Sequence, residues 1–378
     1  MFNLLRSYRL KGRDLFVKHF KKKALAPALV VILGIVLTLQ PFVMAPAEAS
    51  SGWTVVGGAG FSNGAISYTS LAIDASGAVY VAYMDEGYGS KATVMKYSGS
   101  NWEMVGSPVS SGQANWTSLA VYDNTPYLAY RDADEAQKRA KVMKYDGSDW
   151  VPVGSPASAG SVVYTSLAID SGGTPYVAYR DGANEFKATV MKYEGSDWVA
   201  VGSPVFSAGG ADYISLALDS GGTPYVAYRD GANDSKATVM KYEGTDWVPV
   251  GSPGFSAGRA DYISLALDGN GNPYLAYQDW GNDKRATVMK YNGDWETVGS
   301  AGISAGSAER VSLALDSGGN PYVAYSDVAD VWKAKVMKYD GTNWVPVGSP
   351  AFSAGFAGWT SLALDGDGNP YLAYGDGN

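Results

Sequence analysis

The chain has 378 residues, 46% of them hydrophobic, and its 29 basic and 37 acidic residues give a formal net charge of −8. An acidic chain argues against nucleic acids and anionic lipid surfaces as partners. The sequence contains no cysteine, which excludes disulfides and thiol chemistry, so the stability of the fold must come from burial. A chain of this length buries roughly three quarters of its unfolded surface, which is sufficient.

The first 49 residues have the composition of a secretory signal peptide. Residues 1–23 hold eight basic residues and one acidic residue, Ala24–Met44 is largely apolar, and Ala47-Glu48-Ala49 has the small-x-small pattern of a cleavage site. We therefore expect residues 1–49 to direct secretion and to be removed.

An uncleaved membrane anchor is the alternative, because the apolar stretch approaches the length that spans a bilayer. Pro41, Pro46 and the Ala-x-Ala pattern favour cleavage. In both cases residues 50–378 are expected outside the cell, and the membrane is a partner only through an uncleaved leader. This domain keeps 21 basic and 35 acidic residues, a net charge of −14.

The remainder of the chain is a repeat, which is marked by a tryptophan about every 48 residues. These tryptophans are Trp53, Trp102, Trp150, Trp198, Trp247, Trp295 and Trp344. A fixed period of this size is typical of solenoids, arrays and propellers. The copy DYISLALDSGGTPYVAYRDGANDSKATVMKYEGTDWVPVG at 212–251 has no helical periodicity and contains four apolar runs of strand length: Ser215–Leu218, Tyr225–Tyr228, Thr238–Tyr242 and Trp247–Val250. Four short strands per repeat predict an all-β fold, a seven-bladed β-propeller.

Turn and proline positions predict the order of the strands within a blade. The stretch 219–224 has the composition of a tight turn and Glu243-Gly244 that of a hairpin turn, so consecutive strands are expected to be antiparallel. Pro249 lies inside the tryptophan strand, and proline within a sheet is confined to an edge. The tryptophan strand is therefore expected at the outer edge of the blade, and the Ser-Leu-Ala-Leu strand next to the axis.

The last repeat lacks a third strand of the KATVMKY type, because the chain ends at Tyr371–Asn378. Trp53–Gly57 is placed to supply its outer strand. We therefore expect the last blade to be incomplete. Two explanations are open: truncation of the C-terminus, which we favour, or a short blade that exposes a strand edge.

The pieces LALDSGGNPYVAYSD at 313–327 and VMKYDG at 336–341 resemble the NHL-type propeller repeat, with its Asp-x-x-Gly-Asn-x-Tyr-Val-Ala core. The unit is longer than an NHL repeat and carries a Trp-x-x-Val-Gly strand. The whole chain is more similar to secreted bacterial propellers built from Trp-x-x-Val-Gly-Ser units. This similarity implies an extracellular binding or surface module, and it implies no catalytic residues that could be carried over to this chain.

The long connections are predicted to lie on one face of the propeller, where binding sites commonly occur. One large residue stands at the entry to each inner strand: Tyr68, Trp116, Tyr164, Tyr213, Tyr262, Arg310 and Trp359. The loops add Phe206, Phe255, Phe352, Trp280 and Trp332. Flat aromatic faces beside Asp and Arg suit a carbohydrate, and they also anchor protein interfaces. The alternative is that these aromatic residues are buried wedges between blades.

Each repeat also pairs an aspartate at the end of the second strand with a base at the start of the third, as Asp230 with Lys236. One interpretation is an ion pair at the end of the loop, which is worth little in solvent. In the other interpretation Asp181, Asp230 and Asp279 belong to an acidic ring that binds sugar hydroxyls or a metal.

No cofactor or metal is predicted. Residues 365–369 alternate oxygen ligands as a calcium loop does, but the same turn in other repeats lacks them. His19, the only histidine, lies in the predicted leader, so its removal would exclude His-based catalysis. Paired carboxylates are the remaining enzymatic option, with Glu309 at a break in the repeat symmetry. The carboxylates recur in every repeat, however, whereas an active site requires one asymmetric pair.

The sequence thus predicts a secreted or cell-surface module without enzymatic activity, which binds carbohydrate or cell-envelope glycan with its long-loop face. A structural or protein-interaction role at a cell surface is the alternative. A glycan-active enzyme that uses paired carboxylates is a third hypothesis.

Overall fold

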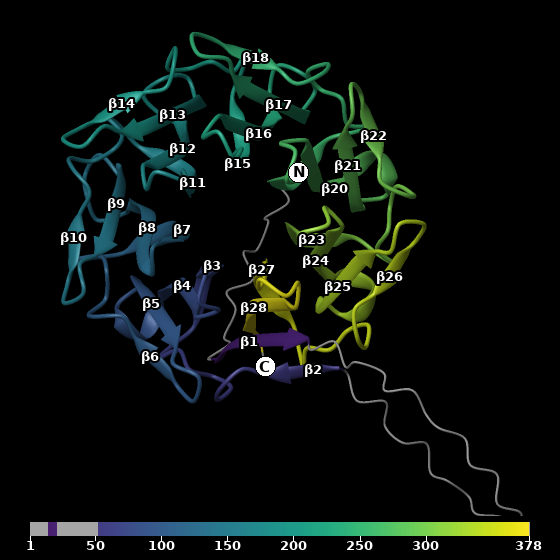
Figure 1. The fold of residues 1–378 in the computed structure, drawn as a ribbon, viewed down its shortest axis with the longest axis horizontal. Coiled ribbons are helices and arrows are strands. Elements are labelled where there is room, and N and C mark those ends of the chain that lie inside the picture. The colour runs from purple at the N-terminus through teal and green to yellow at the C-terminus, as the bar shows by residue number, and fades with distance from the viewer. Residues whose placement is uncertain (1–13, 21–51, 378) are drawn as a thin grey trace, which may run out of the picture.

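The computed structural model describes residues 14–20 and 52–377, which contain 28 β-strands in seven four-stranded sheets. The sheets stand as blades around a common axis (Figure 1). Hydrogen-bonded neighbours within each blade are antiparallel. The prediction of a seven-bladed propeller is confirmed.

The strands of a blade follow one another outwards from the axis, as the proline positions predicted. The inner strands are β3 (Ile66–Ile73), β7 (Ala114–Tyr122), β11 (Val162–Ile169), β15 (Ala211–Leu218), β19 (Ala260–Leu267), β23 (Ala308–Leu315) and β27 (Ala357–Leu364). The second strands are β4 (Val79–Asp85), β8 (Thr125–Asp132), β12 (Pro175–Asp181), β16 (Pro224–Asp230), β20 (Pro273–Asp279), β24 (Pro321–Asp327) and β28 (Pro370–Asp376).

The third strands are β5 (Lys91–Tyr97), β9 (Ala140–Tyr145), β13 (Lys187–Tyr193), β17 (Lys236–Tyr242), β21 (Arg285–Tyr291), β25 (Lys333–Tyr339) and β1 (Asp14–Phe20). The outer strands are β6 (Trp102–Met104), β10 (Trp150–Pro152), β14 (Trp198–Ala200), β18 (Trp247–Pro249), β22 (Trp295–Thr297), β26 (Trp344–Pro346) and β2 (Trp53–Val55). Three 3-10 turns follow second strands: η1 (Glu86–Tyr88), η2 (Trp280–Asn282) and η3 (Val328–Asp330). Within the described residues, no helix has the length and apolar character needed to cross a membrane.

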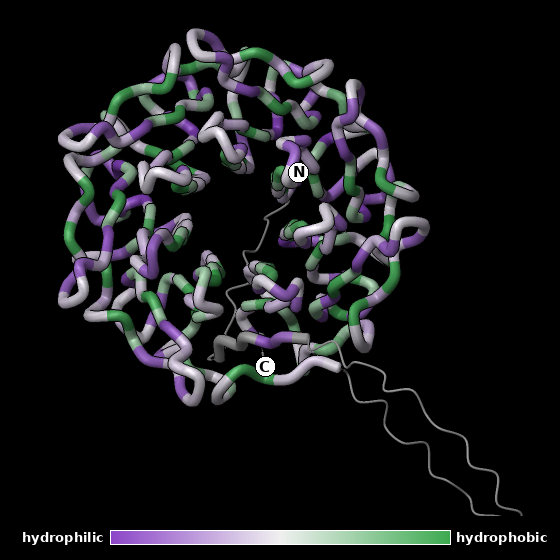
Figure 2. The backbone as a smooth tube through the Cα atoms, in the orientation of Figure 1, coloured by the Kyte–Doolittle hydropathy of each residue, from purple (hydrophilic) through white to green (hydrophobic). Residues whose placement is uncertain are grey.

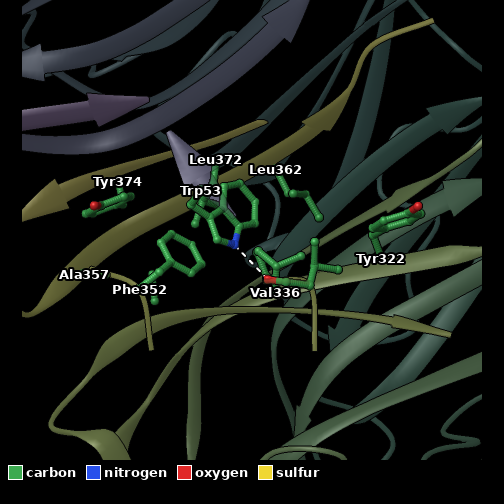
Figure 3. Close-up of a cluster of buried hydrophobic side chains, with 11 residues drawn as sticks. Trp53, Tyr322, Val336, Phe352, Ala357, Leu362, Leu372 and Tyr374 are labelled. Carbon is green, nitrogen blue, oxygen red and sulfur yellow. Dashed lines mark hydrogen bonds between the residues drawn. The ribbon is translucent and has the colours of Figure 1, made fainter. Parts of the chain in front are cut away.

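The apolar core is divided into seven clusters, one at each interface between neighbouring blades. Figure 2 shows hydrophobic residues in every blade of the ring. In the cluster of Figure 3, Trp53 of β2 stacks on Phe352, with ring centroids 4.4 Å apart, and lies beside Leu362 and Leu372. Both faces of the inner sheets are therefore covered by the adjacent blades.

The repeated tryptophan connects each blade to the one before it. Its indole N–H donates to a backbone carbonyl of the preceding blade at 2.7–2.8 Å. The seven pairs are Trp102 with Val56, Trp150 with Val105, Trp198 with Val153, Trp247 with Val201, Trp295 with Val250, Trp344 with Val298, and Trp53 with Val347. The position after the valine requires glycine. Gly202, for example, has a left-handed φ of +66°, and an added Cβ would lie 2.7 Å from the ring of Tyr242.

A second ring of hydrogen bonds lies closer to the axis. The inner-strand serine of each blade accepts from the leucine N–H of the next inner strand at 2.9–3.0 Å, as Leu265 does with Ser215. The ring closes because Leu71 of the first blade donates to Ser361 of the last. The small serine therefore supplies an acceptor as well as room near the axis.

The last blade corrects one prediction. Its third strand is present and is β1, Asp14–Phe20, which lies between β28 and β2 (Figure 1). The register matches the other blades, because Asp14 pairs with Asp376 and Phe20 with Trp53, as Lys236 pairs with Asp230 in a complete repeat. The expectation of an incomplete blade assigned this stretch to the leader because of its flanking basic residues. Cleavage after residue 49, which remains a prediction, would remove this strand.

Candidate functional site

Seven large residues encircle the axis near the face that carries the long connections. Each is the third residue of its inner strand; together we call them the axial collar: Tyr68, Trp116, Tyr164, Tyr213, Tyr262, Arg310 and Trp359. All are half-buried. The structure thus brings together every large residue that the sequence placed at the entry to an inner strand.

A repeated backbone irregularity forms the collar. The pairing register of every inner strand shifts at this position, as between Asp212 and Ser215, which is the signature of a β-bulge. The collar residues have φ between 51° and 57°, the left-handed region. This conformation costs a residue with a side chain about 1–2 kcal/mol, and glycine adopts it freely. Strain of this kind is commonly kept where a side chain has a function.

The collar side chains contact one another around the ring. Five neighbouring pairs of aromatic rings have centroids 4.5–5.3 Å apart: Tyr68 with Trp116, Tyr68 with Trp359, Trp116 with Tyr164, Tyr164 with Tyr213, and Tyr213 with Tyr262. Arg310 closes the ring as a cation, 3.8 Å from the ring centroid of Trp359 and 5.4 Å from that of Tyr262. The collar is therefore a continuous surface of aromatic rings and one guanidinium.

The four tyrosines of the collar keep their hydroxyls protonated. Burial raises the pKa of Tyr68, Tyr164, Tyr213 and Tyr262 above the ordinary value. Among the described residues, no hydrogen bond involves the hydroxyl groups of these tyrosines. Each hydroxyl can both donate and accept. The collar therefore offers four neutral polar groups beside flat apolar faces.

Charged side chains surround the collar between the third and fifth blades. Arg229 donates to Asp261 at 2.5 Å and also to Asp212, and its guanidinium lies 5.0 Å from the ring centroid of Tyr213. Arg180 forms an ion pair with Asp212 at 3.0 Å. Trp280, which is 43% exposed, donates its indole N–H to Asp261 at 3.1 Å. This network fixes the long-loop face on one side of the collar.

The aspartates proposed as an acidic ring are buried and hydrogen-bonded within their own blades. Asp181, Asp230 and Asp279 are at most 4% exposed, and their oxygens accept hydrogen bonds from the following loop and the third strand. Asp230, for example, accepts from the Ala232 N–H and from the Thr238 hydroxyl, both at 2.9 Å. These carboxylates therefore hold the hairpin, and their oxygens already accept hydrogen bonds within their own blade.

The predicted ion pair between the same aspartate and the first base of the third strand is also replaced. Asp230 and Lys236 are opposite one another in register, but the Thr238 hydroxyl takes the carboxylate. Where lysine stands in place of that threonine it binds the aspartate, as Lys335 does with Asp327 at 2.9 Å. The prediction that Asp230 and Lys236 lie opposite one another was therefore right, but the partner of the Asp230 carboxylate is Thr238.

The loop aromatics divide into two groups. Phe206 and Phe255 stack on the tryptophan of the adjacent outer strand, each with centroids 4.1 Å apart, so they are half-buried wedges. Trp280 and Trp332 stand exposed on the long-loop face, together with Phe186, which the sequence analysis did not single out.

Two further candidates lie away from the collar. Asp365 of the calcium-like turn accepts from the N–H groups of Asp367 and Asn369, so its oxygens close the turn itself. His19 of β1 stacks on Tyr371, with ring centroids 4.9 Å apart, toward the opposite face of the propeller. The predicted exclusion of histidine from the folded domain therefore depends on removal of the leader.

Cavities between neighbouring blades are a separate feature. One of about 340 Å³ lies at the tight-turn face and is lined by Tyr176, Lys192, Thr223 and Tyr242. Lys192 lies over the Tyr176 ring, 5.9 Å from its centroid. This cavity is one competing location for a small ligand.

The comparisons with known proteins agree on the fold. No family model matches the sequence, and no curated protein does. The chain is similar in structure to the SapL1 lectin in complex with α-methyl fucoside (TM-score 0.53, 16% identity, 76% of this chain and 98% of that one). It is also similar to an ulvan lyase, a polysaccharide lyase (TM-score 0.53, 13% identity, 83% and 92%), and to a variant of AofleA from Arthrobotrys oligospora (TM-score 0.53, 11% identity, 80% and 94%). At these identities the likeness shows the propeller fold alone, and the chain is a seven-bladed β-propeller.

Proposed function

We propose that this protein is a secreted or cell-surface binding module that recognises carbohydrate, such as a cell-envelope glycan, with the axial collar. The observation that carries the proposal is the left-handed backbone of all seven collar residues. Glycine would be cheaper at each of these positions, yet the sequence has six aromatic residues and an arginine. A cost repeated seven times is consistent with a function of the side chains rather than with stability.

The chemistry of the collar suits a sugar. The apolar faces of tyrosine and tryptophan can stack on the C–H groups of a pyranose, and neutral phenols can exchange hydrogen bonds with its hydroxyls. The similarity in fold to the SapL1 lectin supports the proposal, since that protein binds a sugar, α-methyl fucoside.

The test is a glycan and cell-wall polymer array, followed by titration calorimetry with the tightest oligosaccharide. The informative variants are Tyr213→Gly and Tyr262→Gly, because glycine removes the aromatic face and also relieves the backbone strain. We expect each to weaken binding about tenfold, which corresponds to about 1.4 kcal/mol. Thermal stability should change little, because lost packing and relieved strain offset each other.

Tyr88→Ala is the matched control, because Tyr88 is 36% exposed on the same face but lies outside the collar. It should bind like the parent protein. Saturable binding that survives both glycine variants would contradict the collar as the site. A blank array with folded protein would remove the carbohydrate proposal altogether.

Protein recognition is the second candidate. The exposed Phe186, Trp280, Val331 and Trp332 on the long-loop face favour it, since exposed aromatic residues are common anchors of interfaces. In that case a partner should be lost on Trp280→Ala and retained by Tyr213→Gly. The ulvan lyase neighbour shows that an enzyme can have this fold. The glycan hits should therefore also be checked for chain cleavage, which the proposal does not predict.

A further inference from the structure

Arginines near the collar are paired with a carboxylate in two blades and lack one in another. The second-strand residue before the final aspartate pairs in the ladder with the residue that precedes the collar residue of its own blade. It differs between blades: Met84, Arg131, Arg180, Arg229, Gln278, Ser326 and Gly375. In the blades that contain β12 and β16, this residue is an arginine that forms an ion pair with the residue before the collar residue of the next blade. Arg180 pairs with Asp212 in this way, and Arg229 with Asp261. These two cations are neutralised by carboxylates.

Arg131 occupies the same position in the second blade without a carboxylate. The residue opposite it in the ladder is Asn115, and the residue that precedes the next collar position is Val163. With its amide oxygen turned toward the guanidinium, Asn115 accepts from Arg131 at 3.0 Å. Among the described residues, no carboxylate lies within 4.0 Å of Arg131, and its Nε is buried without a hydrogen bond.

The second cation without an acid is Arg310. It lies between the rings of Tyr262 and Trp359, and its Nε is likewise buried without a hydrogen bond. The preceding residue, Glu309, forms no ion pair in the described part of the chain. Burial raises the pKa of the Tyr262 phenol, the charge of Arg310 lowers it, and the charge of Glu309 raises it further.

The charges of Arg131 and Arg310 both affect the pKa of Tyr68. Burial raises the pKa of its phenol, and the positive charges of Arg131 and Arg310 oppose this effect, so both guanidiniums act on the same part of the collar. A half-buried guanidinium without a counter-charge is costly in a folded protein. A bound oxyanion would remove this cost, because the planar fork of arginine matches the oxygens of a carboxylate or sulfate.

We propose that the collar selects an acidic glycan, whose carboxylate or sulfate group binds Arg131 while its sugar ring lies against the aromatic members of the collar. This inference rests on the proposed function and specifies its ligand class. It also runs against the net charge of the chain, which is −8 and would by itself disfavour an anionic partner.

The test compares ligands that differ only in charge. One pair is an oligogalacturonate and its methyl ester, and the other is a sulfated oligosaccharide and its desulfated form, each titrated at low ionic strength. We expect at least one acidic form to bind about tenfold more tightly than its neutral counterpart, and this advantage to shrink as salt is added. The pair that shows the advantage identifies which oxyanion is recognised.

The variant is Arg131→Met, which removes the charge and keeps an unbranched side chain. It should abolish the preference for the acidic form and leave the affinity for the neutral form within about twofold. Arg285→Met, at an exposed arginine of the same face, is the control. It should change neither the preference for the acidic form nor the affinity for the neutral form. Intact folding of both is checked by thermal unfolding.

Equal affinity for acidic and neutral forms in the parent protein would overturn this inference and leave carbohydrate binding standing. An equal loss for both forms in Arg131→Met would also overturn it, since it would assign Arg131 a structural role. Absence of binding to all four ligands and to the wider array would instead remove the proposed function itself.

Discussion

The indole hydrogen bond between blades can be tested with one substitution, Trp198→Phe. Trp198 is 8% exposed, and its N–H donates to the Val153 carbonyl at 2.8 Å. Phenylalanine keeps most of the apolar contact and leaves this carbonyl without its donor, which costs about 1–3 kcal/mol. The smaller ring also buries less apolar surface, which adds about 1 kcal/mol. The free energy of unfolding should therefore fall by about 2–4 kcal/mol.

The assay is chemical denaturation followed by circular dichroism, because the 11 tryptophans make fluorescence difficult to interpret. The midpoint should decrease with an unchanged slope, since the same surface is exposed on unfolding. Trp280→Phe is the control: this tryptophan is 43% exposed, and water can replace its bond to Asp261, so the loss should stay below about 1 kcal/mol. Equal effects of the two substitutions would refute the assignment of the indole N–H as a connection between blades.

Two further predictions concern the closure of the ring and its response to acid. A protein that begins at residue 50 lacks β1, which pairs with both β28 and β2. Its melting temperature should be at least about 5 °C below that of the full chain. Equal melting temperatures would show that β1 does not complete the blade. The second prediction involves Asp316. Burial alone would raise the pKa of its carboxyl group, but hydrogen bonds from Asn320 and the positive charge of the nearby Lys338 hold this pKa below the ordinary value. A lowered folded-state pKa contributes stability above the unfolded value of about 4, and this contribution is lost as the pH falls through the folded value. Unfolding midpoints should therefore decline below about pH 4, and less steeply in Asp316→Asn; an identical decline in the variant would contradict this role.

The repeat made most of the fold predictable from the sequence. The tryptophan period gave the number of blades, and Pro249 gave the outer position of its strand, because proline is tolerated only at an edge. The inner strand is longer than its apolar run, beginning at Ala211 rather than Ser215, because a bulge interrupts the alternation at Tyr213. The strand Asp14–Phe20 was missed because its basic surroundings and distance from the repeats favoured the leader.

The candidate site was predictable in its members and not in its geometry. The sequence placed a large residue at the entry to each inner strand, but a left-handed backbone at a tyrosine has no sequence signal in a single chain. The aspartates could not be separated from ligand positions, because their hydrogen bonds to loop N–H groups depend on the fold. Arg131 was missed, although variation at its position between otherwise similar repeats was a signal that could have revealed it.

The central claim is that the axial collar binds the sugar, and a crystal structure with the tightest oligosaccharide from the array tests it most directly. We predict that a sugar ring lies in van der Waals contact with collar aromatics such as Tyr213 and Tyr262. A sugar seated instead between two blades at the tight-turn face, against Tyr176 and Lys192, would contradict the account and move the site to the cavity there.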